Sequence, residues 1–342
     1  MQFTAIKKET RILNPQENMQ QKRIPSEIRI DPLTGRSARI CHFMKLHWEK
    51  PDFNALVAGT DQYCPFCPQK VLKVTPCFPE DMIPEGRMIR GDMVIFPNLA
   101  PYDSIGAVAT MGGRHYIPML ALTPELIHAA FGFALDFFRR IETLGHSESV
   151  YHIINWNYMP PAGSSLIHPH LQVFSSSSAP NLMRQELTAA KKYYQKNRRL
   201  YWEDLVAAEE KDGSRYLAKI GRTHWLTAYA PMGVAGDVLA VVEDAKCTLD
   251  LTDRDLVDLA AGLSRVIAGY DKMGIYSFNM NFFTGSEQDD HTRFHLLFSP
   301  RTFFNQSLGT PDIGALRNLF NETLCMAFPE EINTMLKQEF IS

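Results

Sequence analysis

The second half of this 342-residue chain repeats the order of predicted elements found in its first half. In both halves, apolar strand-like runs are followed by a helix with an apolar stripe and then by two further strands. The helices begin near Leu122 and Leu251, 129 residues apart (251 − 122), and two corresponding strands begin near His168 and His295, 127 residues apart (295 − 168). Such constant spacing indicates a fused duplication. We expect an α+β protein whose repeated unit is an antiparallel sheet with a crossing helix.

A pair of histidines at the start of an apolar strand is the strongest chemical signal in the first half. Residues 168–172 read HPHLQ, and alternate residues of a strand share a face, so His168, His170 and Gln172 would lie together. The small residues 163–165 precede them and can approach a phosphate closely. Because a neutral imidazole can attack phosphorus, the pattern favours covalent catalysis at a phosphate. The alternative is two histidines on a solvated strand face.

Two cysteines separated by two residues indicate a metal site. Cys64 and Cys67 have the spacing at which thiolates converge on one tetrahedral zinc ion. The sequence contains no second Cys-x2-Cys pair, so the two remaining ligands must be histidines from elsewhere. The alternative is that both thiols are simply reduced and buried. Six cysteines in a chain of this length fit a reducing compartment better than a disulfide framework.

Composition and charge restrict the class of partner. With 45% hydrophobic and 21% charged residues, the chain can bury a substantial core. A net charge of −3 argues against binding nucleic acid by bulk electrostatics, so small-molecule substrates are favoured. The sequence shows neither a signal peptide nor a run of the roughly 20 apolar residues that a membrane span needs. We therefore expect a cytoplasmic protein that binds neither nucleic acid nor membrane.

The HPHLQ run resembles the active-site signature of the galactose-1-phosphate uridylyltransferase family, within the histidine triad superfamily. The resemblance extends along most of the chain and implies duplicated histidine-triad-like units. It also implies that His170 is the nucleophile that takes a nucleoside monophosphate and that Gln172 binds the phosphoryl oxygens. Triad hydrolases usually carry a third histidine at the position of Gln172, so the glutamine favours the transferase and phosphorylase branches.

The same resemblance implies roles for residues outside the signature. The zinc ligands would be Cys64, Cys67, His115 and His168, and this zinc would be structural. The substrate-binding residues would be Phe96, Asn98, Asn157, Gly163 and Ser165. Lys45 and His47 stand where the family has arginines that contact phosphates. Glu186 and His295 match two ligands of a second metal, but Leu297 and the Met280-Asn281 region replace two others, so we expect that second site to be degraded or empty.

The repeat and the resemblance together predict five segments and one leading activity. The segments are an N-terminal arm (1–30), a first catalytic, zinc-binding half (31–180), a helical connection (181–215), a second, non-catalytic half (216–302) and a C-terminal helical tail (303–342). The arm could be loosely packed or a short helix. We expect a homodimeric nucleotidyltransferase that exchanges a nucleotide sugar or dinucleotide with a sugar phosphate or phosphate. The alternatives are an ADP-sugar or dinucleoside polyphosphate phosphorylase, and a non-catalytic nucleotide-binding homologue.

Overall fold

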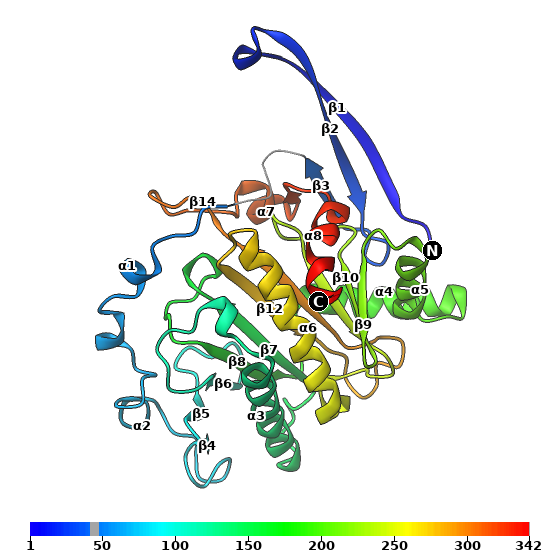
Figure 1. Cartoon of the computed structure of the whole chain (residues 1–342). Helices are drawn as coiled ribbons and strands as arrows, with labels where there is room; N and C mark the ends of the chain where they lie inside the picture. The colour runs from blue at the N-terminus through cyan, green and yellow to red at the C-terminus, as the bar shows by residue number, and fades with distance from the viewer. Residues whose placement is uncertain (42–47, 342) are drawn as a thin grey trace.

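A ten-stranded antiparallel sheet forms the centre of the protein in a computed structural model that describes residues 1–41 and 48–341 (Figure 1). The strand order is β4-β5-β6-β8-β7-β12-β13-β11-β10-β9. The first half contributes β4 (Met88–Arg90), β5 (Met93–Pro97), β6 (Ile105–Thr110), β7 (Tyr151–Tyr158) and β8 (His170–Ser176). The second half contributes β9 (Tyr216–Ile220), β10 (Thr223–Thr227), β11 (Val238–Val242), β12 (Ser277–Phe283) and β13 (His295–Arg301).

The two halves meet at β7 and β12, about which the strand order is symmetric. Reading outward from this junction, the strands of each half follow the same topological order, β7-β8-β6-β5-β4 on one side and β12-β13-β11-β10-β9 on the other. At the junction Asn157 pairs with Asn279 and Asn155 pairs with Asn281. The predicted α+β fold with antiparallel sheets and crossing helices is confirmed, and its two halves are joined edge to edge into one sheet.

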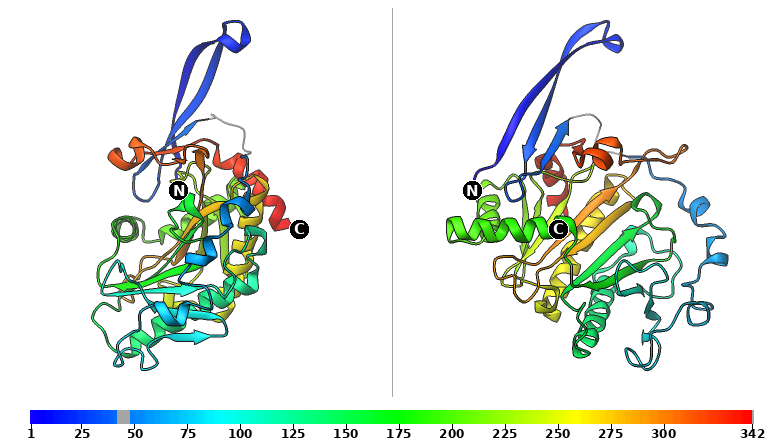
Figure 2. Two further views of the ribbon diagram at one scale, coloured as in Figure 1. Left: turned by 90° about the vertical axis from the view of Figure 1, so that its left-hand side faces the viewer. Right: turned by 180° about the vertical axis from the view of Figure 1, so that it is seen from behind.

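One long helix from each half crosses the same face of the sheet (Figures 1 and 2). These are α3 (Pro124–Thr143) and α6 (Asp253–Lys272), which also pack against each other. Each begins at a threonine whose hydroxyl caps it: Thr123 accepts from the backbone N–H of Leu126, and Thr252 forms a reciprocal capping box with Asp255. The apolar stripes of both helices and the alternate sheet residues beneath them form the main hydrophobic core.

The opposite face of the sheet carries polar side chains. On β7 and β8 the residues Ile154, Trp156, Leu171 and Val173 belong to the main core, so the residues between them point to the other side. Over the second half, this other face is partly covered by α4 (Asn181–Asn197) and α5 (Tyr201–Asp212), whose aromatic residues pack on β10 and β11. The candidate site lies on this face.

The N-terminal arm is a β-hairpin, so the alternative prediction of a short helix is wrong. Strands β1 (Thr4–Asn14) and β2 (Gln20–Ile30) pair over their whole length and project from the body (Figures 1 and 2). After Ile30 the chain turns and β2 continues into β3 (Ser37–Cys41), with Ile30 opposite Ser37. Strand β3 also pairs in parallel with β16 (Thr323–Cys325), giving a four-stranded sheet that joins the two ends of the chain.

The C-terminal tail contains strands as well as the predicted helices. Its helices are α7 (Ala315–Phe320) and α8 (Pro329–Ile341), and its strands are β14 (Phe303–Asn305), β15 (Thr310–Pro311) and β16. Helix α8 packs on α6 through Ile332 and Leu336, which are fully buried. Two short helices, α1 (Phe53–Val57) and α2 (Val71–Val74), flank the cysteine pair. Within the described ranges, no helix has the length and hydropathy required to cross a bilayer.

Candidate functional site

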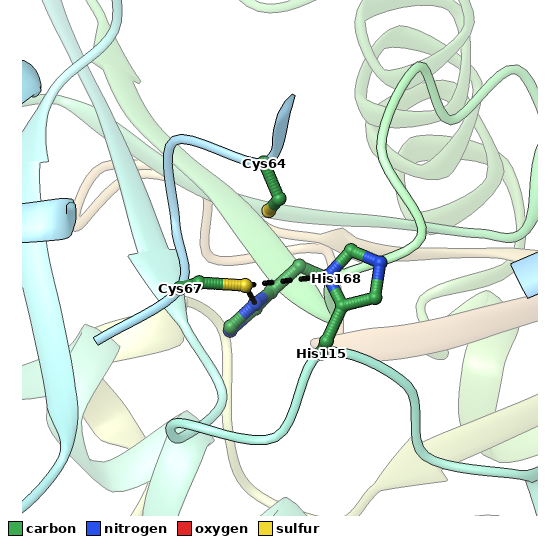
Figure 3. Close-up of side chains that lie close together, drawn as sticks. All are labelled: Cys64, Cys67, His115 and His168. Carbon is green, nitrogen blue, oxygen red and sulfur yellow. Dashed lines mark hydrogen bonds between the residues drawn. The ribbon is translucent and has the colours of Figure 1, made fainter. Parts of the chain in front are cut away.

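Two cysteines and two histidines form a compact cluster beside the start of β8 (Figure 3). One ligand atom from each of Cys64, Cys67, His115 and His168 lies within 4.8 Å of the others. Residues 64 and 67 follow a 3-10 turn (Thr60–Tyr63), residue 115 lies in the loop after β6, and residue 168 immediately precedes β8. In residues 1–41 and 48–341, this is the one group of three or more such side chains with this spacing.

The backbone around the two cysteines is arranged as a knuckle that supports thiolate sulfur. The N–H of Phe66 lies 3.4 Å from Cys64 Sγ, and the N–H groups of Lys70 and Val71 both donate to the Cys67 carbonyl at 2.9 Å. Burial and the neighbouring Cys64 raise the pKa of the Cys67 thiol to about 11. A cation bound at the cluster would reverse this effect, because a coordinating thiol is deprotonated by the metal.

Both histidines of the cluster present an unprotonated Nδ1 toward the sulfurs. His168 Nε2 lies 2.8 Å from the Gly112 carbonyl, which can only accept, so Nε2 carries the proton. His115 Nε2 lies 2.7 Å from Thr60 Oγ1, whose own hydrogen is donated to the Val57 carbonyl, so this nitrogen also donates. The Nδ1 atoms lie 3.4 Å (His115) and 3.8 Å (His168) from Cys67 Sγ. Two sulfurs and two such nitrogens fit a tetrahedral zinc ion.

His170 is held by the backbone of the same strand in one tautomer. Its Nδ1 lies 2.8 Å from the carbonyl oxygen of His168, so Nδ1 donates and Nε2 keeps its lone pair. The residue is 9% exposed, and burial lowers the pKa of its imidazole. The Phe66 ring meets the His170 ring edge-on with centroids 5.1 Å apart. The site therefore combines a neutral imidazole with a free nitrogen and a covering aromatic ring.

Two predicted polar residues lie on the same face of the sheet as His170. Gln172 is two residues further along β8, opposite Asn155 of β7, and its Oε1 accepts from the hydroxyl of Tyr102. Asn157 Oδ1 accepts from Asn279 Nδ2 at 2.7 Å. Sequence reasoning missed both Tyr102 and Asn279. The repeat offered a signal for Asn279, because it stands in the second half where Asn155 stands in the first.

The other predicted substrate-binding residues lie in the loop before β8 or in and just after β5. Gly163 has a φ of +85° and is exposed, as is Ser165, in the loop that enters β8. Phe96 is buried in a small apolar cluster, with its ring 5.2 Å from that of Phe66. Asn98 is partly buried and its Oδ1 accepts from the N–H of Ala100. The predicted phosphate contacts Lys45 and His47 lie outside the described residues.

Glu186 and His295 do come together, as a pair. Glu186 Oε2, on α4, lies 3.4 Å from His295 Nε2, and the His295 ring lies between those of Trp202 and Phe283, at 4.1 and 4.9 Å. No third cysteine, histidine or carboxylate in the described ranges joins them in a metal-binding group. Leucine occupies position 297 in this half.

The same face also carries cavities beside the histidine. One of about 580 Å³ is lined by Tyr102 and Asn155 of the first half, Arg184 of α4 and Asn281 of the second half. Another of about 430 Å³ lies over the second half of the sheet. Neither lining includes His170, whose ring contacts that of Phe66.

Comparison with known proteins identifies the fold. No family model matches the chain. An uncharacterized protein of Archaeoglobus fulgidus is 28% identical over 307 residues, which cover 89% of each chain. Among solved structures, a GalT-like protein from Arabidopsis thaliana matches with a TM-score of 0.68 and 17% identity, covering 92% of this chain and 98% of its own.

Two further solved structures match the chain in fold. An ADP-glucose phosphorylase from Arabidopsis thaliana with bound ADP-glucose has a TM-score of 0.68 and 17% identity, covering 92% of this chain and 99% of its own. A uridylyltransferase has a TM-score of 0.64 and 20% identity, with coverage of 92% and 98%. The chain thus has the fold of the GalT-like protein, the ADP-glucose phosphorylase and the uridylyltransferase. This likeness in fold confirms the resemblance seen in the sequence.

Proposed function

We propose that the protein is a nucleotidyltransferase that works through a covalent nucleotidyl-histidine at His170. The preferred reaction is exchange between a nucleotide sugar and a sugar phosphate, as in hexose-1-phosphate uridylyltransferases. The observation that carries this proposal is the 2.8 Å hydrogen bond from His170 Nδ1 to the His168 carbonyl, which leaves the Nε2 lone pair available for attack.

The proposed reaction has two displacement steps. In the first, His170 Nε2 attacks the α-phosphorus of the donor, and the bond from this phosphorus to the bridging oxygen breaks. The electron pair leaves with the sugar phosphate. The imidazole then carries a positive charge, which the His168 carbonyl stabilises through the Nδ1–H bond. In the second step an oxygen of the acceptor phosphate attacks the same phosphorus, and the P–N pair returns to Nε2.

Two amide side chains are suited to bind the transferring phosphoryl group. Gln172 Oε1 is occupied by the Tyr102 hydroxyl, and Asn157 Oδ1 is occupied by the Asn279 amide. Each residue therefore keeps its NH₂ group as a donor. In this proposal these donors, with the backbone of the loop that contains Gly163 and Ser165, bind the phosphoryl oxygens on which negative charge develops.

A zinc ion at the four-residue cluster would be structural. Cys64, Cys67, His115 and His168 would fill all four positions of a tetrahedral ion and leave none for substrate. Bound zinc would supply rigidity, by fixing the residue whose carbonyl sets the tautomer of His170. Glu186 and His295 remain a proposed remnant of a second metal site.

Phosphorolysis is the second candidate activity. It shares the covalent step but uses inorganic phosphate or a similar anion as acceptor, acting on an ADP-sugar or a dinucleoside polyphosphate. The similarity in fold to an ADP-glucose phosphorylase, equal in TM-score to the best match quoted above, favours including it. Non-catalytic nucleotide binding is the third candidate, supported by the Phe66 ring packed against His170.

Intact-protein mass spectrometry tests the covalent step. The protein is incubated with UDP-glucose, ADP-glucose or diadenosine tetraphosphate, and we expect a mass increase of one nucleoside monophosphate with at least one donor. His170→Ala should abolish it, whereas His128→Ala, at a half-exposed histidine on α3, should not. An adduct that survives His170→Ala contradicts the proposal, and nucleotide binding without any adduct supports the non-catalytic alternative. Turnover that requires inorganic phosphate identifies a phosphorylase.

A further inference from the structure

The repeat places a second site in the other half of the sheet. With the offset of 127 residues between β8 and β13, His170 corresponds to Leu297 and Gln172 corresponds to Ser299. Leu297 and Ser299 both line the cavity of about 430 Å³. This cavity thus occupies in the second half the place that the candidate active site occupies in the first.

The asparagines of the first half also have counterparts in this cavity. Asn155 and Asn157 of β7 correspond to Asn279 and Asn281 of β12, 124 residues later (279 − 155), and both later residues line the cavity. Asn279 is engaged by Asn157 and Arg301. The Asn281 amide has no hydrogen-bond partner in the described part of the chain, so its donors are available to a ligand. A leucine cannot attack phosphorus, so a ligand here would bind without reacting.

Two of the carboxylates around this cavity are paired with arginines. Asp312 accepts from the Arg301 guanidinium at 2.6 to 3.0 Å. Glu322 pairs with Arg39 at 3.2 Å and accepts from Ser37 at 2.9 Å. The nearby buried Asp237 accepts from the backbone N–H groups of residues 232 and 233 and from Ser299. Asp312 and Glu322 are therefore balanced by arginines, whereas Asp237 is held by neutral donors and its charge acts on Arg317.

Arg317 is a half-buried cation of the lining, and the charged groups near it are Arg36, Asp237 and Arg301. Its Nη1 is buried and has no hydrogen-bond partner, and its Nη2 reaches only the sulfur of Met232, at 3.8 Å. It forms no ion pair with a carboxylate in the described part of the chain. Burial and the neighbouring Arg36 lower the pKa of this guanidinium, which nevertheless stays charged at neutral pH. Because Nη1 has no partner and two further arginines lie near this guanidinium against the one carboxylate of Asp237, the site favours an anion.

We propose that this cavity is a second, non-reacting binding site for a small phosphomonoester, held by Arg317 and the Asn281 amide. Guanidinium matches phosphate in geometry and can bind it through two parallel N–H bonds. A volume of about 430 Å³ is in the range of small-molecule sites, large enough for a sugar phosphate or a mononucleotide. The choice of phosphate over carboxylate rests on the proposed function, because the corresponding residues of the first half are proposed to bind a phosphoryl group.

Titration calorimetry of the full chain with glucose 1-phosphate, AMP and acetate tests this site. We expect Arg317→Gln to remove one phosphomonoester site per chain, or to raise its Kd at least tenfold. Gly314→Phe should do the same, because Gly314 lines the cavity and a phenyl group there would fill it. A side chain added at this position meets no atom within 4 Å of its Cβ, so the protein should still fold. Arg139→Gln, at an exposed arginine on α3, is the control. Acetate should not compete with either phosphomonoester.

The outcomes separate this proposal from the proposed function. Arg317→Gln should leave nucleotidyl-histidine formation unchanged, and His170→Ala should leave the Arg317 site unchanged. The ligand-free Arg317→Gln protein should have a Tm equal to or above that of the wild type, because a buried guanidinium nitrogen without a hydrogen-bond partner has been removed. Binding with unchanged stoichiometry and Kd in both pocket variants overturns the proposal. A lower Tm with unchanged binding would show that the arginine is only structural, and equal affinity for acetate would overturn the phosphate assignment.

Discussion

His170 Nδ1 donates a hydrogen bond of 2.8 Å to the backbone carbonyl of His168. His168 turns its own Nδ1 toward Cys67 at the cysteine–histidine cluster. The residue that fixes the tautomer of the proposed nucleophile is therefore itself fixed by the cluster. Variants of the cluster and variants of the residues around His170 can therefore be compared for metal content, stability and reactivity.

Loss of one cluster cysteine should lower both zinc content and stability. We expect Cys64→Ser to lose bound zinc and to lower Tm by roughly 5–10 °C, because structural zinc binding contributes directly to folding free energy. Metal analysis and differential scanning calorimetry on the same sample measure both effects. Cys77→Ser, at an exposed free cysteine outside the cluster, is the matched control. Full zinc content with an unchanged Tm in Cys64→Ser would count against the metal assignment.

Thr60 should strengthen metal binding without touching the metal. Its hydroxyl accepts from His115 Nε2 at 2.7 Å and so holds the ring with Nδ1 toward the sulfurs. We expect Thr60→Val to weaken zinc affinity by roughly 10-fold to 100-fold, the usual effect of losing such an orienting partner. Competition with a zinc chelator gives the ratio of affinities. Thr60→Ser, which keeps the hydroxyl, should restore most of the affinity, and equal affinities in all three proteins would exclude this role.

Asp255 should stabilise the second half of the fold in a pH-dependent way. Although burial opposes its ionisation, hydrogen bonds from Arg222 and Thr252 lower the pKa of this carboxyl to about 2. A lowered folded pKa stabilises the protein above the unfolded pKa of about 3.9, and this contribution disappears as pH falls toward 2. We expect Asp255→Asn to cost about 2 kcal/mol of unfolding free energy at pH 7.

Urea unfolding of wild type and Asp255→Asn between pH 7 and pH 3 measures this difference. The difference in unfolding free energy between the two proteins should be constant above about pH 5. It should become smaller below the unfolded pKa of about 3.9. Asp253→Asn, at an exposed carboxylate two residues earlier on α6, should show a much smaller difference in unfolding free energy. A gap that stays constant down to pH 3 would show that Asp255 stabilises the helix by something other than its charge.

The sequence predicted those parts of the protein that depend on local pattern. The repeat between residues 122 and 295 gave the two crossing helices and their strands, because burial imposes the same periodicities on both halves. The cysteine pair gave Cys64 and Cys67, and the family resemblance gave His115 and His168 as the other members of the cluster. The hairpin of β1 and β2 was missed because its strands are largely exposed and carry charged residues. Contacts such as the ion pair between Glu9 and Arg23 join residues that are far apart in sequence, so no local pattern marks them.

Contacts between distant residues could not be predicted from pattern. Strand β16 has three residues and pairs with β3 almost three hundred positions earlier, so no local signal marks it. Thr60, Tyr102 and Asn279 act on site residues through tertiary contacts of ordinary side chains. Leu297 is the exception, because the repeat and the family resemblance together predicted a non-catalytic second half.

Gln172 should act as a donor in the covalent step rather than as a structural residue. Its Oε1 accepts from Tyr102 and its NH₂ group is left for the phosphoryl oxygens. Gln172→Glu replaces that donor by a carboxylate, so we expect the rate of nucleotidyl-histidine formation to fall roughly 10²-fold to 10³-fold, as for loss of an oxyanion donor. Rapid-quench mass spectrometry with the donor identified for the wild type measures this rate.

Tyr102→Phe provides the companion measurement, because it removes only the hydroxyl that orients Gln172. This exposed tyrosine should be dispensable for folding, so its variant should keep the wild-type Tm and lose less rate than Gln172→Glu. If orientation is its role, adding Tyr102→Phe to Gln172→Glu should cost little more, since the two residues act as one unit. Fully additive losses would mean that Tyr102 contacts the substrate itself, and an unchanged rate in Gln172→Glu would exclude the glutamine from the proposed mechanism.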